Sequence, residues 1–153
     1  MKIYTRCAKQ NLPITITEAW NFLSNPRNLQ TITPNYMGFH IKSGADRIMY
    51  AGQIIEYIVT PILGIKTRWV TEITHIEDKK YFVDEQRFGP YAFWHHKHFI
   101  KEIDGGVEME DLLHYKLPFG ILGQFVHPFL VQPKLDEIFE YRNMKLVELF
   151  GKF

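Results

Sequence analysis

The feature that most constrains the fold is a change of hydrophobic period near residue 120. Between Tyr36 and Pro118 the chain has six short runs rich in β-branched and aromatic residues, and clusters of Gly, Pro and Asp separate them. From about Gln132 to the end, apolar residues recur instead at the i, i+3, i+4 spacing of a helix. This order predicts consecutive antiparallel strands followed by one long amphipathic C-terminal helix.

The other segments complete the predicted order of elements. A first strand is expected at Lys2–Gln10, followed by a short helix capped by Thr17 and a second short helix at Pro26–Ile32. The six later strands are expected at Tyr36–Lys42, Gln53–Thr60, Ile65–Ile76, Tyr81–Arg87, Tyr91–Ile103 and Val107–Leu117, with Pro61–Gly64 among the links. Ile121–Val131 is expected as a separate turn or a kinked lead-in to the long helix. Because the sheet must cover that helix, residues 1–153 are predicted to form a single α+β domain with a curved seven-stranded antiparallel sheet and an enclosed cavity.

Composition narrows the classes of function. The chain carries 12 Phe, 8 Tyr and 3 Trp, more aromatic side chains than a small core requires, and this excess favours a lined cavity. Its formal net charge is +1 and no stripe of Lys and Arg is present, so we expect no nucleic-acid partner.

Cysteine content and apolar runs bear on location. The lone Cys7 excludes an internal disulfide and points to a reducing compartment. The first residues lack an apolar leader segment, and no stretch approaches the length of a membrane span. We therefore expect a cytoplasmic protein without stable membrane insertion.

The last predicted hairpin gives the best-defined strand register. The run Asp104–Val107 suggests a two-residue turn centred on Gly105 and Gly106. On that register Trp94, His96, His98 and Ile100 face Leu117, Tyr115, Leu113 and Asp111 on the inner side, while Lys101 faces Glu110, His95 faces Lys116 and Lys97 faces His114 on the outer side. Phe93 and Phe99 fall on the outer side and require a cover.

Polar residues on this inner side are candidates for chemistry. His96, His98 and Asp111 are expected on an apolar surface, where polar groups need partners or a function. The favoured interpretation is a hydrogen-bonded cavity wall that requires no metal or cofactor. Two alternatives remain open: proton transfer between Asp111 and His98, and a metal bound by two imidazoles and a carboxylate.

Two questions about the neighbouring strands remain open: which face of the Tyr81–Arg87 strand is inward, and whether Arg68 and Glu72 contact a ligand. Trp69 and Gln86 are further candidates for ligand contact, but the inward face of the Tyr81–Arg87 strand is undecided, because the loop after it fits either parity. Arg68 and Glu72 share a strand face and either contact a polar ligand group or form an exposed charge row.

Several segments together resemble a known family. They are FGPYAFWHHKHF at residues 88–99, Asp111, YKLPFG at residues 115–120, and a closing stretch with His127-Pro128, Pro133, Leu135, IFEYR at residues 138–142 and Leu149-Phe150-Gly151. These segments are similar to the ligand-binding SRPBCC proteins of the START/Bet v 1-like superfamily, close to the group named polyketide cyclase/dehydrase or cell-division-inhibitor-like. The resemblance implies a helix-grip fold with a hydrophobic cavity, used elsewhere for lipids, sterols, polyketides and plant hormones. The matching positions are Trp94, His96, His98, Asp111 and Tyr115, and the subgroup brings no agreed catalytic motif.

These observations predict a binding protein that carries or sequesters a hydrophobic or amphipathic small molecule. The ligand contacts are expected from Trp69, Gln86, Trp94, His96, His98, Asp111, Leu113 and Tyr115. One alternative is a cyclase or dehydratase that uses Asp111 and His98 for proton transfer. The other is a protein-interaction module, with a possible homodimer and with Phe93 and Phe99 as anchors.

Overall fold

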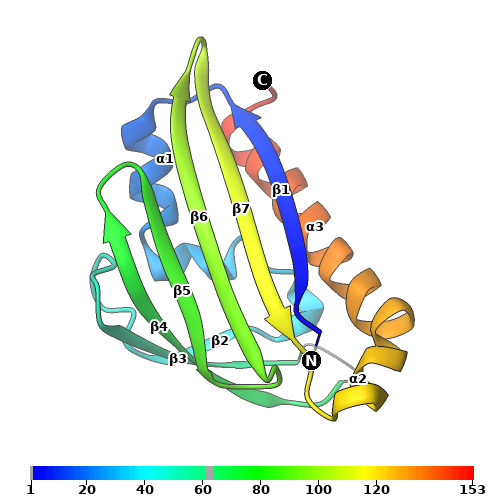
Figure 1. The fold of residues 1–153 in the computed structure, drawn as a ribbon. Helices are drawn as coiled ribbons and strands as arrows, with labels where there is room; N and C mark the ends of the chain where they lie inside the picture. The colour runs from blue at the N-terminus through cyan, green and yellow to red at the C-terminus, as the bar shows by residue number, and fades with distance from the viewer. Residues whose placement is uncertain (1, 61–63) are drawn as a thin grey trace.

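A seven-stranded antiparallel sheet forms one layer of the molecule, in the strand order β1-β7-β6-β5-β4-β3-β2 (Figure 1). The strands are β1 (Tyr4–Leu12), β2 (His40–Ser43), β3 (Gln53–Val59), β4 (Thr67–Glu77), β5 (Tyr81–Phe88), β6 (Phe93–Ile103) and β7 (Gly106–Lys116). This computed structural model describes residues 2–60 and 64–153, so most of the expected Pro61–Gly64 link lies outside the described residues. The predicted curved sheet of seven strands is confirmed.

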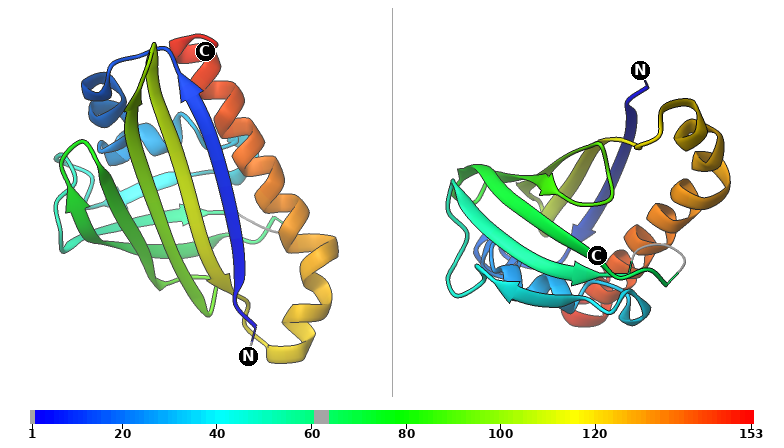
Figure 2. Two further views of the ribbon diagram at one scale, coloured as in Figure 1. Left: turned by 45° about the horizontal axis from the view of Figure 1, so that its top comes forward. Right: turned by 90° about the horizontal axis from the view of Figure 1, so that it is seen from below.

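Helices cover one face of the sheet, which curves around the longest of them (Figure 2). They are α1 (Ile16–Leu23), the 3-10 turns η1 (Pro26–Gln30) and η2 (Asn35–Met37), α2 (Gly120–Val126), the π-helical turn η3 (His127–Val131) and α3 (Gln132–Phe150). The predicted long helix and its kinked lead-in are both present. None of the helices in the described part of the chain is long and apolar enough to cross a membrane.

Two local predictions near the N-terminus are wrong. Helix α1 begins earlier than expected: Thr15 is its cap, because its hydroxyl accepts from the Glu18 amide while the Glu18 carboxylate accepts from the Thr15 amide. The strand expected at Tyr36–Lys42 begins only at His40, because Asn35–Met37 form a 3-10 turn. β-Propensity of the side chains is overridden there by the turn that follows Pro34.

The predicted register of the β6–β7 hairpin is wrong by two residues. Ile103 pairs with Gly106, so the turn is Asp104–Gly105 and Gly106 already belongs to β7. Gly106 fits this position because a Cβ atom there would lie 2.1 Å from the Leu12 carbonyl oxygen of β1. The observed pairs are Trp94 with Tyr115, His96 with Leu113, His98 with Asp111, Ile100 with Met109, Lys101 with Glu108, His95 with His114 and Lys97 with Leu112. A shift of two residues keeps every side chain on its predicted face.

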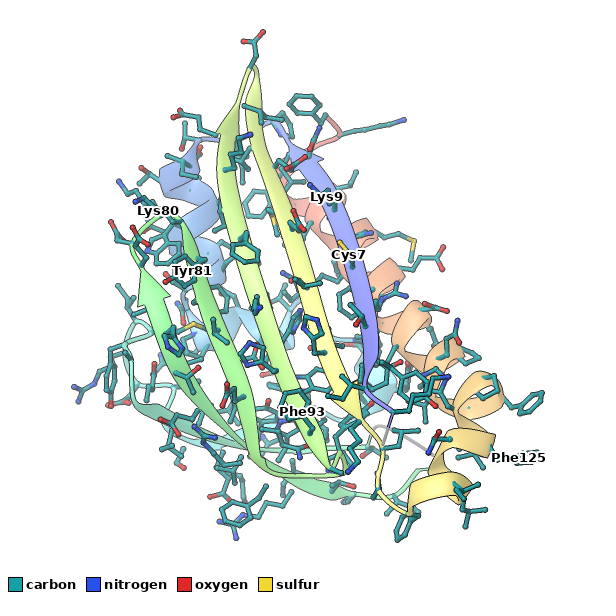
Figure 3. The ribbon with its side chains drawn as sticks, viewed as in Figure 1. Cys7, Lys9, Lys80, Tyr81, Phe93 and Phe125 are labelled. Atoms are coloured by element: carbon teal, nitrogen blue, oxygen red, sulfur yellow. The ribbon has the colours of Figure 1, made fainter. Side chains whose placement is uncertain are left out.

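Ion pairs on the outer face of the sheet decide between the two interpretations of Arg68 and Glu72. Arg68 pairs with Glu56, and Arg87 pairs with Glu72, so these charges form an exposed row rather than a ligand contact. Phe99 packs against Tyr81 at a ring distance of 5.9 Å and is half-buried. Phe93 lies on the same face and remains 40% exposed (Figure 3).

The core lies between the concave face of the sheet and the helices. One apolar cluster joins α1 to β6, β7 and Leu146 of α3, and a second joins Leu135 and Phe139 of α3 to the far end of β7. A third cluster of aliphatic and aromatic residues lies mainly on β3 and β4 and includes Tyr57 and Trp69. Space remains between the third cluster and α3, and the candidate site lies there.

Candidate functional site

A cavity of about 190 Å³ lies between the sheet and α3. Its walls are mainly aromatic and aliphatic; they include Phe22, Phe39, Ile55, Tyr57, Val59, Trp69, Ile73, Phe82, Tyr91, Trp94, Leu135, Ile138 and Phe139. Trp69 is central to the aromatic wall, because its ring contacts those of Trp94 at 5.1 Å and Tyr91 at 5.6 Å. A rigid apolar wall of this kind favours a flat or hydrophobic ligand.

A cluster of buried charged groups borders the cavity. His98 lies between two carboxylates: its Nε2 donates to Asp84 Oδ2 at 2.6 Å, and its Nδ1 lies 2.7 Å from Asp111 Oδ1. The His96 ring lies beside it, tilted by 43° at a centroid distance of 3.9 Å, and its Nε2 is 3.2 Å from the same Asp111 oxygen. Arg142 Nη1 donates to that oxygen at 2.9 Å. We call these five residues the charge cluster.

The pKa directions within the charge cluster show which groups carry charge. Burial opposes the charged form of both carboxyls, but Arg142 and the histidines outweigh it and hold the pKa of Asp111 well below its usual value. The pKa of Asp84 is likewise lowered, chiefly by the hydrogen bond from His98. Burial would lower the pKa of His98, but the two carboxylates raise it, whereas burial and the neighbouring His98 lower the pKa of His96. These directions favour the ionised form of both carboxyls, the protonated form of His98 and the neutral form of His96, and the carboxylate oxygens within 2.7 Å of both ring nitrogens of His98 suit that form.

The hydrogen bonds within the charge cluster compete with metal binding. One ligand atom each from Asp84, His96 and His98 lie within 4.8 Å of one another, close enough to share a metal ion. The carboxylate of this trio is Asp84 and not the expected Asp111. His98 Nε2 already donates its proton to Asp84, so a metal bound at that nitrogen would have to displace the proton. The absence of a metal stays our prediction.

Four buried nitrogens on the cavity wall make no hydrogen bond within the described residues. Two of them, His96 Nε2 and His98 Nδ1, still lie within 3.2 Å of Asp111 Oδ1, so two N–H groups are left without an acceptor. They are the indole Nε1 of Trp69 and the Nε of Arg142, and both side chains line the cavity. A buried donor without a partner costs free energy, so such groups are normally satisfied. The wall of the cavity is thus apolar but offers hydrogen-bond donors.

Comparison with known proteins identifies the fold. No family model and no curated protein matches the sequence. Among solved structures, TTHA0849 from Thermus thermophilus is similar at 17% identity over 95% of both chains, with a TM-score of 0.70. Ara h 8.0201 matches at 14% identity over 96% of this chain and 99% of its own, with a TM-score of 0.65. The ginseng major latex-like protein 151 from Panax ginseng matches at 7% identity over 97% of both chains, with a TM-score of 0.64.

This chain has the Bet v 1-like helix-grip fold. The fold expected from the sequence resemblance is confirmed by these neighbours. The likeness spans almost the whole chain, and it places the cavity described above in the space that a helix grip leaves between its sheet and its C-terminal helix.

Within the helix-grip fold, four of the predicted ligand residues line the cavity: Trp69, Trp94, His96 and His98. Asp111 lies behind the two histidines and is buried. Leu113 is fully buried in the cluster that joins β7 to α3. Only the first four are therefore placed for direct contact with a ligand in this cavity.

Gln86 and Tyr115 have other positions. Gln86 holds the loop between β5 and β6, because its side chain donates to the Tyr91 carbonyl and accepts from the Tyr91 amide. The Tyr115 hydroxyl and Nε2 of His127 share a hydrogen bond of 2.7 Å, and His127 in turn stacks on Tyr4. These three rings border a second, polar cleft of about 180 Å³ between β1 and the start of α3.

Sequence reasoning missed two residues of the site, Asp84 and Arg142. Asp84 and Phe82 both line the cavity, so this is the face of β5 that points inward, a question that the hairpin loop left open. The Asp84 carboxylate also accepts a hydrogen bond from the Trp94 indole at 3.2 Å. Arg142 had a visible signal: it occupies a position of the apolar stripe of α3, between Phe139 and Leu146. A charged residue at such a position indicates a buried partner of opposite charge.

Proposed function

We propose that this protein binds a hydrophobic or amphipathic small molecule in the cavity between sheet and α3, as a carrier or a sequestering protein. The observation that carries the proposal is the pairing of an aromatic wall with the unsatisfied N–H groups of Trp69 and Arg142. Burial of an apolar ligand body against the wall supplies affinity. An acceptor oxygen on the ligand would satisfy the buried donors and fix its orientation.

The charge cluster narrows the class of ligand. Because Asp84 already pairs with His98 and Asp111 already pairs with Arg142, a charged head group would add an unpaired charge to a buried site. A neutral acceptor such as a ketone, ester or hydroxyl carries no such cost. Lipid-like or polyketide-like molecules with a carbonyl group meet both requirements.

A matched pair of probes tests this proposal. 2-Acetylnaphthalene and 2-ethylnaphthalene have nearly the same shape, but only the first carries an acceptor oxygen. We expect both to bind and the ketone to bind about tenfold more tightly, as one hydrogen bond to a buried or charged donor implies. Isothermal titration or quenching of tryptophan fluorescence gives the two dissociation constants.

Trp69→Phe is the matched variant, because it keeps an aromatic ring in the wall and removes the indole N–H. The preference for the ketone should shrink in this variant, while the affinity for 2-ethylnaphthalene should change little. Trp20→Phe serves as the control, because Trp20 is a buried core residue that does not line the cavity. Failure of both probes to bind at their solubility limit, or equal affinities in the wild type, would contradict the proposal.

One observation favours a second candidate function, acid–base catalysis on the bound molecule. His98 borders the cavity and lies between two carboxylates, an arrangement that can hold and return a proton. Asp111 lies behind His98, so it orients the imidazole and favours its protonated form, and it does not contact a ligand. Such an enzyme should accelerate deuterium exchange of the acetyl protons of 2-acetylnaphthalene in heavy water, and His98→Gln should abolish the acceleration. A pure carrier should bind the ketone without any acceleration.

A further inference from the structure

A group of large apolar side chains is exposed on α2 and η3, at the end of the molecule where the N-terminus also lies (Figure 1). We call it the end patch; its members are Phe119, Ile121, Leu122, Phe125 and Phe129, each between 66% and 85% exposed. Phe125 projects away from the sheet (Figure 3). No Asp, Glu, Lys or Arg occurs from residue 117 to residue 133. A cluster of this kind marks an interaction surface, because isolated surface hydrophobics do not gather in this way.

The backbone holds the end patch in its exposed position. Phe119 adopts the left-handed conformation, with φ of 64°, which is rare and costly for a bulky residue. Gly123 allows α2 to turn tightly against the preceding segment, since a Cβ atom there would lie 2.1 Å from the Pro118 carbonyl oxygen. The strained turn and the close approach together direct α2 outward.

The charged residues that flank the end patch in the sequence are basic. Between Asp111 and Asp136 the sequence contains no carboxylate, and its charged residues are Lys116 and Lys134. A third cation, Lys2, lies 4.7 Å above the Tyr4 ring, which stacks on His127 of η3. The carboxylates that follow, Asp136 and Glu137, pair with Arg6 and Lys134, so Lys134 belongs to an ion pair, whereas Lys2 and Lys116 form no ion pair with a carboxylate of the described residues. The surface is therefore apolar at its centre and cationic at its edge.

We propose that the end patch docks this protein on the surface of an anionic lipid bilayer. Exposed Phe, Leu and Ile side chains with basic residues beside them are the features of segments that lie in the interfacial plane of a membrane. The patch is a projecting helix and turn, which a fluid interface can accept without a matching groove. The lysines at its edge complement anionic head groups. This inference does not depend on what the cavity binds.

Co-sedimentation of the full-length chain with lipid vesicles tests the docking. We expect binding to vesicles of phosphatidylcholine and phosphatidylglycerol at roughly three to one, and weaker binding to phosphatidylcholine alone or at high salt. The double variant Phe125→Ser/Phe129→Ser should lower the partition coefficient by at least about tenfold, because two large apolar side chains no longer enter the interface. Ile54→Ser, which removes an exposed apolar residue of β3, is the matched control and should bind as the wild type does.

Circular dichroism and thermal unfolding show whether each variant remains folded. Three results would overturn the proposal: no sedimentation of the wild type at millimolar lipid, equal loss in the Ile54→Ser control, or unchanged binding in the folded double variant. Light scattering tests the competing interpretation, in which a second copy of this chain covers the end patch. If the wild type is a dimer that Phe125→Ser/Phe129→Ser dissociates, and neither binds vesicles, the end patch is a contact between two copies of this chain.

Discussion

Arg142 is the residue on which burial of the Asp111 carboxylate depends. It reaches across from α3 to donate at 2.9 Å, and both side chains are almost fully buried. Arg142→Gln should lower the free energy of unfolding at neutral pH by about 3 kcal/mol, because it leaves a buried carboxylate with less opposing charge. Urea unfolding gives the value. Arg87→Gln, which breaks the exposed pair with Glu72, should cost less than about 1 kcal/mol, and equal losses would contradict this role of Arg142.

His98 makes part of the stability dependent on pH. Its pKa is raised in the folded state, because the two carboxylates outweigh burial. The folded protein therefore holds this proton more tightly than the unfolded chain. The resulting stability is complete below pH about 6.5 and is lost as the pH rises through the folded pKa. Thermal unfolding should show a larger deficit of His98→Gln relative to wild type at about pH 5.5 than at about pH 9.

His127 provides a comparison of opposite sign. Burial lowers its pKa, so the unfolded chain takes up this proton at a higher pH than the folded protein does. The stability that neutral His127 supplies is present above pH about 6.5 and is lost as the pH falls toward the folded pKa. The deficit of His127→Phe should therefore shrink on acidification. If the stability deficits of His98→Gln and His127→Phe changed with pH in the same direction, the opposite pKa shifts assigned to the two histidines would be contradicted.

At this scale the sequence shows which faces the side chains occupy but not which partners they meet. Alternation placed His96, His98 and Asp111 inward correctly, because a two-residue register error does not change the face. Asp84 reaches the charge cluster from the neighbouring strand β5, and Arg142 reaches it from helix α3, 58 residues after Asp84 in the sequence. No local pattern encodes that distance, so the charge cluster as a whole could not be predicted.

Among the elements, α3 supports both the core and the cavity. Leu146 is 1% exposed and packs with α1, β6 and β7, while Leu135, Ile138 and Phe139 line the cavity. Leu146→Ala should lower the free energy of unfolding by about 2 to 5 kcal/mol through the cavity that it leaves. Met144→Ala, at a position that is 59% exposed on the same helix, should change it by less than about 0.5 kcal/mol. Chemical denaturation of both variants tests whether this face of α3 is the packed one.

Element boundaries were predicted well where a period was long and poorly where a turn intervened. The strands β3 to β7 and helix α3 follow the expected order because each has several residues of consistent alternation or helical spacing. The segment before β2 failed, because a turn after Pro34 outweighs the β-forming residues beside it. The Asp104–Gly105 turn was displaced because the approach of Leu12 to Gly106 is a contact between distant parts of the chain.

For the whole molecule, the sequence resemblance predicted the fold and the existence of a cavity, and the neighbours of the Bet v 1-like fold confirm the fold. Neither reveals what the cavity holds, since folds of this class host different functions. The proposed ligand class rests instead on two features of this chain: an aromatic wall around Trp69, and a charge cluster whose members pair with one another beside buried N–H donors. The end patch is a separate feature on α2 and η3.

The three tryptophan indole N–H groups allow the most direct test of the central claim, that the cavity binds a molecule through an acceptor oxygen. In an NMR titration of nitrogen-15-labelled protein with 2-acetylnaphthalene, the Trp69 indole resonance should move furthest, because this N–H gains an acceptor. Trp94 already donates to Asp84 and should move less, and Trp20 lies outside the cavity and should stay in place. Saturation of the protein without movement of the Trp69 resonance, or an equal movement of Trp20, would contradict the account.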